Sequence, residues 1–361
     1  MIVRISYGGG APANVAECSG RFWKTADRSN EWAAGQCANA AKPLAFAASI
    51  TISLTGDTGK AVPAKDQKMT YASLRNPNAL VDTSSLHHRL RDPNLRLFDC
   101  STVLQFEEGG ERPYRVISCA AEHEAGHIPG ASYFDLQRDF SRSDSPFGMT
   151  LADPAVVAAA FENAGVDDQS HVILYSRRSM SWATRFWWML RWLGFDNVSI
   201  LDGGFDKWVA EERPLSKEPD SYPVGQLTPN PRPEVFVSKD DVLACLGDPE
   251  VCLVNALGRD VFSGQTARYG RPGRIPGSIN IPQIELVDPK TNAFLPAAKI
   301  AKIFEQAGTK NASTHVTYCG GGIFATVDAF WLHQLGYDKV AVYENSMSEW
   351  GPDETLPIEV G

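Results

Sequence analysis

The sequence lacks the features that mark several classes of protein. Its cysteines are scattered, with no Cys-x-x-Cys pair and no regular spacing, at positions 18, 37, 100, 119, 245, 252 and 319. An odd and irregular set does not predict a disulfide framework, so we expect a reducing, cytoplasmic compartment. No apolar run is long enough to span a bilayer, so we expect no membrane partner.

The chain also has no excess of basic residues. Its 361 residues include 34 Lys and Arg against 43 Asp and Glu, which gives a formal net charge of −9. Nucleic-acid binding needs clustered positive charge that neutralises phosphates, so we expect no nucleic-acid partner. The apolar fraction of 43% is ordinary for a globular protein, and the length allows two domains.

What the sequence does contain is an internal repeat. Several segments of the first half recur in the second half, in the same order and at nearly constant separation. Gly126-His127-Ile128-Pro129-Gly130 returns as Gly273-Arg274-Ile275-Pro276-Gly277, and Leu193-Gly194-Phe195-Asp196 returns as Leu335-Gly336-Tyr337-Asp338. Ordered recurrence of this kind predicts one domain that has been duplicated.

Each copy has the pattern of an α/β domain. Short apolar runs bounded by polar turns predict strands at 95–100, 172–175 and 198–201, and again at 251–254, 316–318 and 340–343. Stretches rich in aromatic residues predict helices at 183–193 and 326–335. Alternating strands and helices predict a mostly parallel sheet flanked by helices, with the working site beyond the carboxyl ends of the strands.

The repeat also predicts where the domains lie. We expect a first domain at 75–213, a linker rich in proline and glycine at 214–234, and a second domain at 235–361. Residues 1–70 belong to neither copy and lack sustained periodicity. We interpret them as a disordered extension or as a mis-assigned start with translation beginning at Met69, and a cleaved targeting segment is a further alternative.

Cys319 stands at the position where this architecture places a working site. It ends a predicted strand and opens the loop Cys319-Gly320-Gly321-Gly322-Ile323-Phe324-Ala325, which leads into a predicted helix. The unpartnered N–H groups and the macrodipole at a helix start favour a thiolate, the nucleophilic form of cysteine. Glycines let a small anion approach the backbone. We therefore predict that Cys319 is a nucleophile; Ser176 takes its place in the first copy.

These motifs resemble the rhodanese superfamily in its tandem-domain form, the thiosulfate and 3-mercaptopyruvate sulfurtransferases. The resemblance covers roughly residues 75–361 and rests on the two Gly-x-Ile-Pro-Gly motifs, the segment 201–208 (LDGGFDKW) and the loop opened by Cys319. It implies two rhodanese-like domains, of which only the second is catalytic. It further implies that Cys319 takes a sulfane sulfur from thiosulfate or 3-mercaptopyruvate as a persulfide and passes it to cyanide or a thiol. The loop amides of 320–325 would hold the negative charge, and no metal or organic cofactor is implied.

The chain departs from both branches of this family. Thiosulfate-specific members have basic residues after the cysteine, where this chain has Gly320 and Gly321. Mercaptopyruvate-type members have a hydroxyl residue at 321 and Thr at 324, where this chain has Gly321 and Phe324, and residues 145–149 supply neither the His nor the Asp of that branch. Val261 falls at the place of the usual donor-binding arginine, which leaves Arg259, Arg268 and Arg271 as candidates. The sequence therefore does not decide between thiosulfate and 3-mercaptopyruvate as the sulfur donor.

Other patterns have simpler interpretations. We interpret the remaining cysteines as small apolar side chains, and the tryptophans at 187, 188 and 192 as core of the first copy. Arg177 and Arg178 belong either to the site or to surface salt bridges. The His123-Glu124-Ala125-Gly126-His127 segment matches a zinc-protease pattern, but its glycines and proline favour a loop, so we expect no metal site.

Two other functions remain as alternatives. The first is a non-catalytic sulfur carrier or partner-binding module. The second is a cysteine-dependent phosphatase or arsenate reductase, which is disfavoured because Ala325 and Thr326 stand where a phosphate loop needs an arginine.

Overall fold

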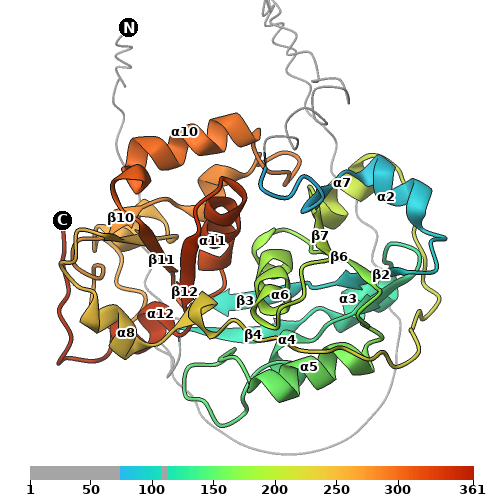
Figure 1. The fold of residues 1–361 in the computed structure, drawn as a ribbon, viewed down its shortest axis with the longest axis horizontal. Helices are drawn as coiled ribbons and strands as arrows, with labels where there is room; N and C mark the ends of the chain where they lie inside the picture. The colour runs from blue at the N-terminus through green and yellow to red at the C-terminus, as the bar shows by residue number, and fades with distance from the viewer. Residues whose placement is uncertain (1–73, 107–112) are drawn as a thin grey trace, which may run out of the picture. The chain divides into compact units, whose positions relative to one another are not determined.

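Two parallel sheets of five strands each form the framework of the chain (Figure 1). The computed structural model describes residues 74–106 and 113–361, so the expected extension at 1–70 lies outside the described residues. The strand order is β1-β7-β6-β2-β5 in the first lobe and, read from the matching edge, β8-β12-β11-β9-β10 in the second. Each strand thus has a counterpart at the same place in the other sheet, which confirms the predicted α/β fold.

The elements follow the predicted alternation of strands and helices. The first lobe contains β1 (Leu80–Val81), α2 (Thr83–Arg89), β2 (Leu95–Asp99), β3 (Thr102–Phe106), β4 (Tyr114–Ser118), α3 (Ala120–Ala125), β5 (Ala131–Tyr133), α4 (Leu136–Asp139), α5 (Pro154–Asn163), β6 (His171–Tyr175), α6 (Ser181–Trp192), β7 (Val198–Leu201) and α7 (Gly204–Ala210). The predicted strands and helix of this copy are all present, shifted at their ends by no more than two residues.

The second lobe repeats this plan after a connecting segment without helix or strand at 211–232. It contains η1 (Pro233–Val235), β8 (Phe236–Val237), α8 (Lys239–Ala244), β9 (Val251–Asn255), α9 (Arg259–Phe262), β10 (Ile279–Asn280), η2 (Gln283–Leu286), α10 (Ala297–Ala307), η3 (Thr309–Asn311), β11 (Thr314–Tyr318), α11 (Ala325–Gln334), β12 (Lys339–Tyr343) and α12 (Ser346–Trp350). Among the described residues, no helix combines the length and apolar character needed to cross a membrane.

A hairpin that sequence reasoning did not predict extends the first lobe. Strands β3 and β4 pair antiparallel, from Thr102 opposite Ser118 to Phe106 opposite Tyr114. This hairpin forms a separate two-stranded sheet. Most of its side chains are partly or fully exposed, whereas Tyr114 is buried. The weak burial explains why its strands lack the apolar runs that marked the other strands.

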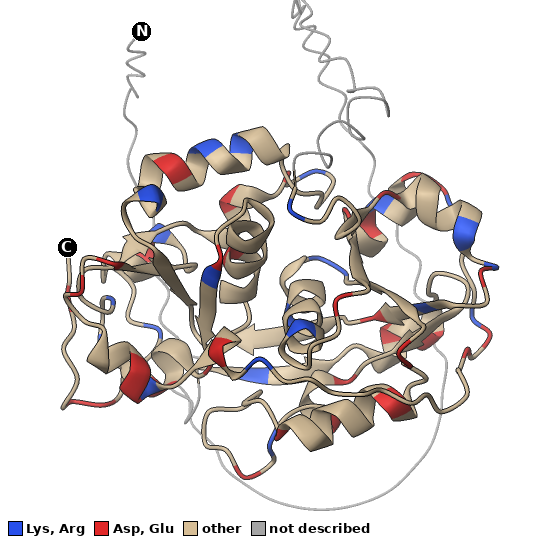
Figure 2. Cartoon of the chain, in the orientation of Figure 1, with Lys and Arg blue, Asp and Glu red and all other residues tan. Residues whose placement is uncertain are grey.

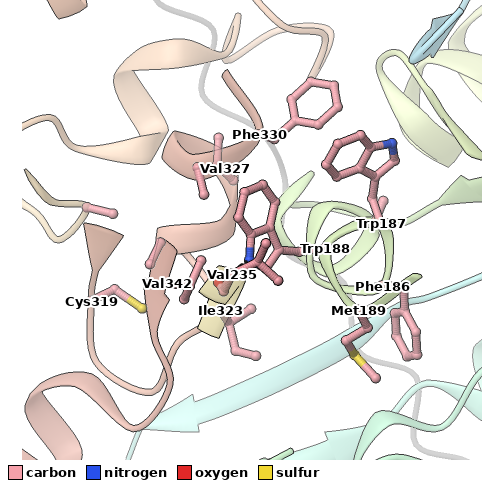
Figure 3. Close-up of a cluster of buried hydrophobic side chains, with 14 of the residues drawn as sticks. Phe186, Trp187, Trp188, Met189, Val235, Cys319, Ile323, Val327, Phe330 and Val342 are labelled. Carbon is pink, nitrogen blue, oxygen red and sulfur yellow. Dashed lines mark hydrogen bonds between the residues drawn. The ribbon is translucent and has the colours of Figure 1, made fainter. Parts of the chain in front are cut away.

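The tryptophans of α6 join the two lobes, which corrects their assignment to the first core alone. The ring of Trp187 lies 5.0 Å from that of Phe330 in α11, edge to face, and Trp188 Nε1 donates to the carbonyl of Val235 at 2.9 Å. Figure 3 shows both side chains in one apolar cluster with Cys319. Helix α6 follows β6, and α11 follows β11. These two helices, one behind each of the equivalent loops, pack on each other.

Candidate active site

Cys319 directly follows β11, at the carboxyl end of the central strand of the second sheet. The chain then forms the loop 320–324, and α11 begins at Ala325. Four backbone amides of this segment lie close enough to the Cys319 sulfur to lower its pKa: those of Ala325, Gly321, Ile323 and Gly320. Inward-pointing amides of this kind form an anion-binding cradle. The structure thus places the amides of 320–325 around the Cys319 sulfur.

The amides point inward because the carbonyls of the same segment are bound from outside. The carbonyl of Cys319 accepts from the amide of Met347 at 3.1 Å, and that of Gly320 accepts from the amide of Ser348 at 2.7 Å. On its other side, the amide of Cys319 donates to Ser346 Oγ at 3.0 Å. The first turn of α12 thus holds one edge of the loop, and each peptide plane that it fixes directs an N–H toward the sulfur.

At each glycine of the loop, a Cβ would come into close contact with a neighbouring group. Gly322 has a φ of +72°, and a Cβ there would overlap the carbonyl oxygen of Glu344. A Cβ on Gly320 would overlap the hydroxyl of Tyr269, and one on Gly321 would lie 2.5 Å from the hydroxyl of Tyr114. We expected the glycines to make room for an anion, and they also make room for two phenol groups.

The Cys319 thiol is enclosed, with 1% of the residue exposed. Tyr114, Tyr269 and Met149 approach the loop over Gly320 and Gly321 and form what we call the roof. Burial raises the pKa of Cys319, and the four amides lower it by less, so the pKa lies above its usual value. The expectation of a favoured thiolate is therefore wrong for this closed conformation, because desolvation outweighs the cradle.

This enclosure predicts an unusual pH dependence of cysteine reactivity. We expect the rate of Cys319 alkylation by iodoacetamide to keep rising with pH beyond the ordinary thiol range, because only the thiolate reacts and burial raises its pKa. Peptide mass spectrometry over a pH series measures this rate, with the same cysteine in urea-unfolded protein as the control. A plateau reached by about pH 7, well below the ordinary thiol pKa of about 8.5, would contradict the expectation.

The three candidate arginines differ in their contacts. Arg259 forms a bidentate ion pair with Glu285, at 2.8 and 2.6 Å, on the protein surface. Arg271 donates to backbone carbonyls near the carboxyl terminus, including that of Leu356 at 2.9 Å. Arg268 has neither an ion pair nor a hydrogen bond within the described parts of the chain; its guanidinium lies 4.7 Å over the ring of Phe106. Of the three, Arg268 alone is next to the roof, since it directly precedes Tyr269.

Arg185 is a functional candidate that the sequence did not reveal. It lies in α6 of the first lobe, is fully buried, and donates to the carboxylate of Glu344 at 2.6 and 2.9 Å. The same guanidinium reaches the carbonyl of Gly322 at 3.2 Å. Thr184, its neighbour, bonds Thr326 of α11 at 2.8 Å. The first lobe therefore also holds the nucleophile loop, at Gly322 and at α11. A lone arginine in an aromatic helix gave no signal for this role.

The equivalent loop of the first lobe is filled by side chains. Ser176 follows β6 as Cys319 follows β11, and its hydroxyl donates to the carbonyl of Ser179 at 2.6 Å. The Arg177 guanidinium lies 3.6 Å over the ring of Phe205 and pairs with buried Asp99 at 3.3 Å. Arg178 pairs with Glu122 at 2.9 Å. These arginines are bound within their own lobe and do not join Cys319.

The two histidines of the zinc-protease pattern also have other partners. His123 lies in α3, which ends at Ala125, so the expectation of a loop is wrong for this half of the motif and right from Gly126 onward. His123 Nδ1 lies 3.3 Å from Asp99, and His127 bonds the carbonyls of His123 and Glu218 at 2.8 and 3.1 Å. The two rings stack 4.1 Å apart. Stacked rings with bonded nitrogens do not converge on one point as ligands would.

None of the other described cysteines lies in the nucleophile loop. Cys100 and Cys119 are buried, Cys245 and Cys252 are half-buried, and all four are free thiols. Burial raises the pKa of each. Cys18 and Cys37 lie outside the described residues.

Known proteins share this sequence pattern. Residues 82–211 and 260–353 match the rhodanese-like domain. The 3-mercaptopyruvate sulfurtransferase of Escherichia coli K12 is 31% identical over 282 residues, which cover 77% of this chain and 97% of that protein. The sulfur carrier protein TtuD of Thermus thermophilus is 30% identical and covers 81% of this chain and 99% of its own length. A mitochondrial thiosulfate/3-mercaptopyruvate sulfurtransferase of Arabidopsis thaliana is 29% identical, with 80% of each chain covered.

Solved structures agree with this assignment. The crystal structure of the 3-mercaptopyruvate sulfurtransferase SseA from Escherichia coli is 28% identical, with a TM-score of 0.63, and covers 74% of this chain and 98% of that one. An anaerobic ergothioneine biosynthesis enzyme from Chlorobium limicola has a TM-score of 0.66 at 20% identity, with 80% of this chain and 71% of that chain covered, and so shares the fold. Two matched domains and relatives covered over nearly their full length lead to one conclusion: the chain belongs to the rhodanese family, among its sulfurtransferases.

Proposed function

We propose that Cys319 is the residue that carries the transferred sulfur. Its thiolate attacks the outer sulfur of thiosulfate or 3-mercaptopyruvate, and the resulting persulfide passes that sulfur to a thiophilic acceptor such as cyanide or a thiol. The observation that carries this proposal is the convergence of four loop amides on the Cys319 sulfur. Amides that stabilise an anion at this atom also stabilise the persulfide anion that replaces it.

We propose that Arg268 binds the anionic end of the donor. Arg259 and Arg271 are committed to Glu285 and to backbone carbonyls, whereas Arg268 is exposed beside the roof and, within residues 74–106 and 113–361, contacts an aromatic ring but forms no ion pair or hydrogen bond. Both donors are anions, and an arginine that is not paired with a carboxylate can receive them. Since the thiol is closed to solvent, the roof has to open before the donor reaches it.

Replacing Arg268 tests this assignment. We expect Arg268→Met to lower kcat/KM for the donor by about ten- to a hundredfold, because a charge-assisted hydrogen bond contributes about 1.5–3 kcal/mol. Thiocyanate formation with thiosulfate and cyanide, and separately with 3-mercaptopyruvate and cyanide, provides the measurement. Arg259→Met, which removes an equally charged surface residue, is the matched control. Equal losses in the two variants would reject a specific role for Arg268.

The donor assays also separate the two leading functions. Thiocyanate from at least one small donor supports the enzyme. If neither donor reacts while a persulfidated protein transfers sulfur to Cys319, the chain is a sulfur carrier, the function named for its Thermus thermophilus relative. Hydrolysis of an aryl phosphate has no support in the loop, where Ala325 and Thr326 occupy the positions that would need an arginine.

We further propose the cellular setting and the domain limits expected from the sequence. Free thiols at all described cysteines support a reducing, cytoplasmic compartment. Lys and Arg are interspersed with Asp and Glu over both lobes, which supports small-molecule rather than nucleic-acid partners (Figure 2). The two equivalent sheets support domains at 75–213 and 235–361, joined by the linker 214–234.

A further inference from the structure

Two phenol groups from different lobes meet over the nucleophile loop. Tyr114 begins β4 of the first-lobe hairpin, and Tyr269 precedes β10 in the second lobe. The Tyr269 hydroxyl fills the place of a Cβ on Gly320, and the Tyr114 hydroxyl lies 2.5 Å from the place of a Cβ on Gly321. Each hydroxyl therefore takes up space that a side chain on the loop would need, and Tyr269 is close enough to Cys319 for a charge there to shift its pKa.

The two hydroxyls and the thiol form one enclosed polar cluster. Tyr114 and Tyr269 are each 4% exposed. Burial raises the pKa of Tyr269, and ionisation of Cys319 or Tyr114 raises it further. Tyr269 thus stays protonated at physiological pH, where it can donate a hydrogen bond but cannot act as a base.

An arginine completes this cluster on its outer side. Arg268 lies over the ring of Phe106 at 4.7 Å, and that ring lies 5.8 Å from the ring of Tyr114, its partner across the hairpin. A cation and two hydroxyls thus lie along one side of the nucleophile loop. An α-keto carboxylate has the matching order of groups: a carboxylate, then a keto oxygen, then the carbon that bears its sulfur.

The two donors place different demands on such hydroxyls. When the Cys319 thiolate attacks the sulfur of 3-mercaptopyruvate, an S–S bond forms and the C–S bond breaks. The electron pair of the C–S bond remains on the pyruvate fragment as an enolate, whose charge lies on the keto oxygen until water supplies a proton to carbon. Thiosulfate loses its pair as sulfite, which needs neither an enolate site nor a proton at carbon. Hydroxyls aimed at a developing oxyanion therefore help the first donor selectively.

We propose that Tyr114 and Tyr269 form an oxyanion hole for the enolate that leaves an α-keto thiol donor such as 3-mercaptopyruvate. The proposal rests on the function proposed for Cys319. It gives the first lobe, which lacks the nucleophile, a direct role in catalysis, because Tyr114 reaches the site from the hairpin of that lobe. When the roof opens to admit the donor, the hydroxyls exchange contact with the loop for contact with the keto oxygen.

Removing each hydroxyl tests the proposal. In Tyr114→Phe and in Tyr269→Phe, we expect the ratio of kcat with 3-mercaptopyruvate to kcat with thiosulfate to fall at least about tenfold, because one oxyanion donor contributes this much or more. Tyr337→Phe, which removes a hydroxyl bonded to Thr309 at 2.8 Å in the second lobe, is the control and should leave the ratio within about twofold. An unaltered ratio in both variants overturns the proposal.

The result stays decisive if one donor is inactive or one variant misfolds. If wild-type protein accepts sulfur from thiosulfate alone, this inference fails while the function proposed for Cys319 stands. If it accepts sulfur from neither donor, the function itself fails. If only 3-mercaptopyruvate reacts, the rate of Cys319 alkylation serves as the reference in place of the rate with thiosulfate. A tyrosine variant that loses the alkylation rate and the rate with 3-mercaptopyruvate equally then overturns the proposal. Should Tyr114→Phe fail to fold, Tyr269→Phe decides.

Discussion

Cys319→Ser abolishes sulfur transfer: we expect thiocyanate formation to fall by at least about a thousandfold with either donor, as when other nucleophiles are removed. A serine hydroxyl ionises far less readily than a thiol and cannot form a persulfide. The amide cradle and Arg268 remain in the variant, so it should still bind the donor anion. Thiocyanate detection under saturating cyanide gives the rate, and the donor's protection of the protein against thermal unfolding reports binding.

Cys245→Ser is the matched control for this substitution. Cys245 is a free thiol in the same lobe, half-buried after α8, and its sulfur lies 3.2 Å from the carbonyl of Val242 rather than in an amide cradle. We expect its replacement to leave the rate within about twofold, as for a substitution away from the site. Full activity in Cys319→Ser would mean that another thiol carries the sulfur. Cys119, which has the Arg178 guanidinium at 3.6 Å, would then be the first to test.

Arg185→Met should destabilise the chain by about 3–5 kcal/mol, because it leaves the carboxylate of Glu344 largely buried without its counterion. Arg185 is fully buried and Glu344 is 14% exposed at its side chain, so little water replaces the lost contact. The carbonyl of Gly322 also loses its hydrogen bond from Arg185. One peptide plane of the nucleophile loop is then no longer held in place. Urea unfolding measures the stability, and Cys319 alkylation across pH measures the loop.

Two further variants give this prediction its controls. Arg191→Met removes another cation of α6, whose partner Asp196 is 57% exposed, and should cost no more than about 1 kcal/mol. Arg185→Met combined with Glu344→Gln should regain part of the lost stability, since an uncharged amide needs no counterion. If the double variant is as unstable as the sum of the single ones, the ion pair is not the cause.

The sequence was sufficient for the parts of the site that are local. Apolar runs bounded by turns located the strands, and the duplicated motifs predicted that one α/β domain occurs twice, as the two sheets of equal strand order show. The position of Cys319 between a central strand and a helix predicted the amide cradle, because a strand, a glycine loop and a helix start are all contiguous in the chain. For these features, neighbours in sequence are neighbours in space.

The parts that sequence reasoning missed depend on distant segments. Tyr114 reaches Gly321 from a hairpin more than two hundred positions earlier, and the strands of that hairpin lack a strong apolar signal. Arg185 reaches Gly322 from the other lobe. The raised pKa of Cys319 follows from a roof that these long-range contacts build, so local chemistry alone predicted the opposite direction. In the sequence, Gly320 and Gly321 indicated that the loop needs free space beside its backbone. They did not indicate that two tyrosine hydroxyls fill this space.

Locating the persulfide tests the central claim most directly. Wild-type protein is mixed with 3-mercaptopyruvate or thiosulfate without an acceptor, the sulfur is trapped by alkylation, and the peptides are analysed by mass spectrometry. We expect one added sulfur atom on the peptide that contains Cys319, and its loss when cyanide is added before trapping. An added sulfur on a different cysteine, or none with either donor while thiocyanate still forms, would contradict the account.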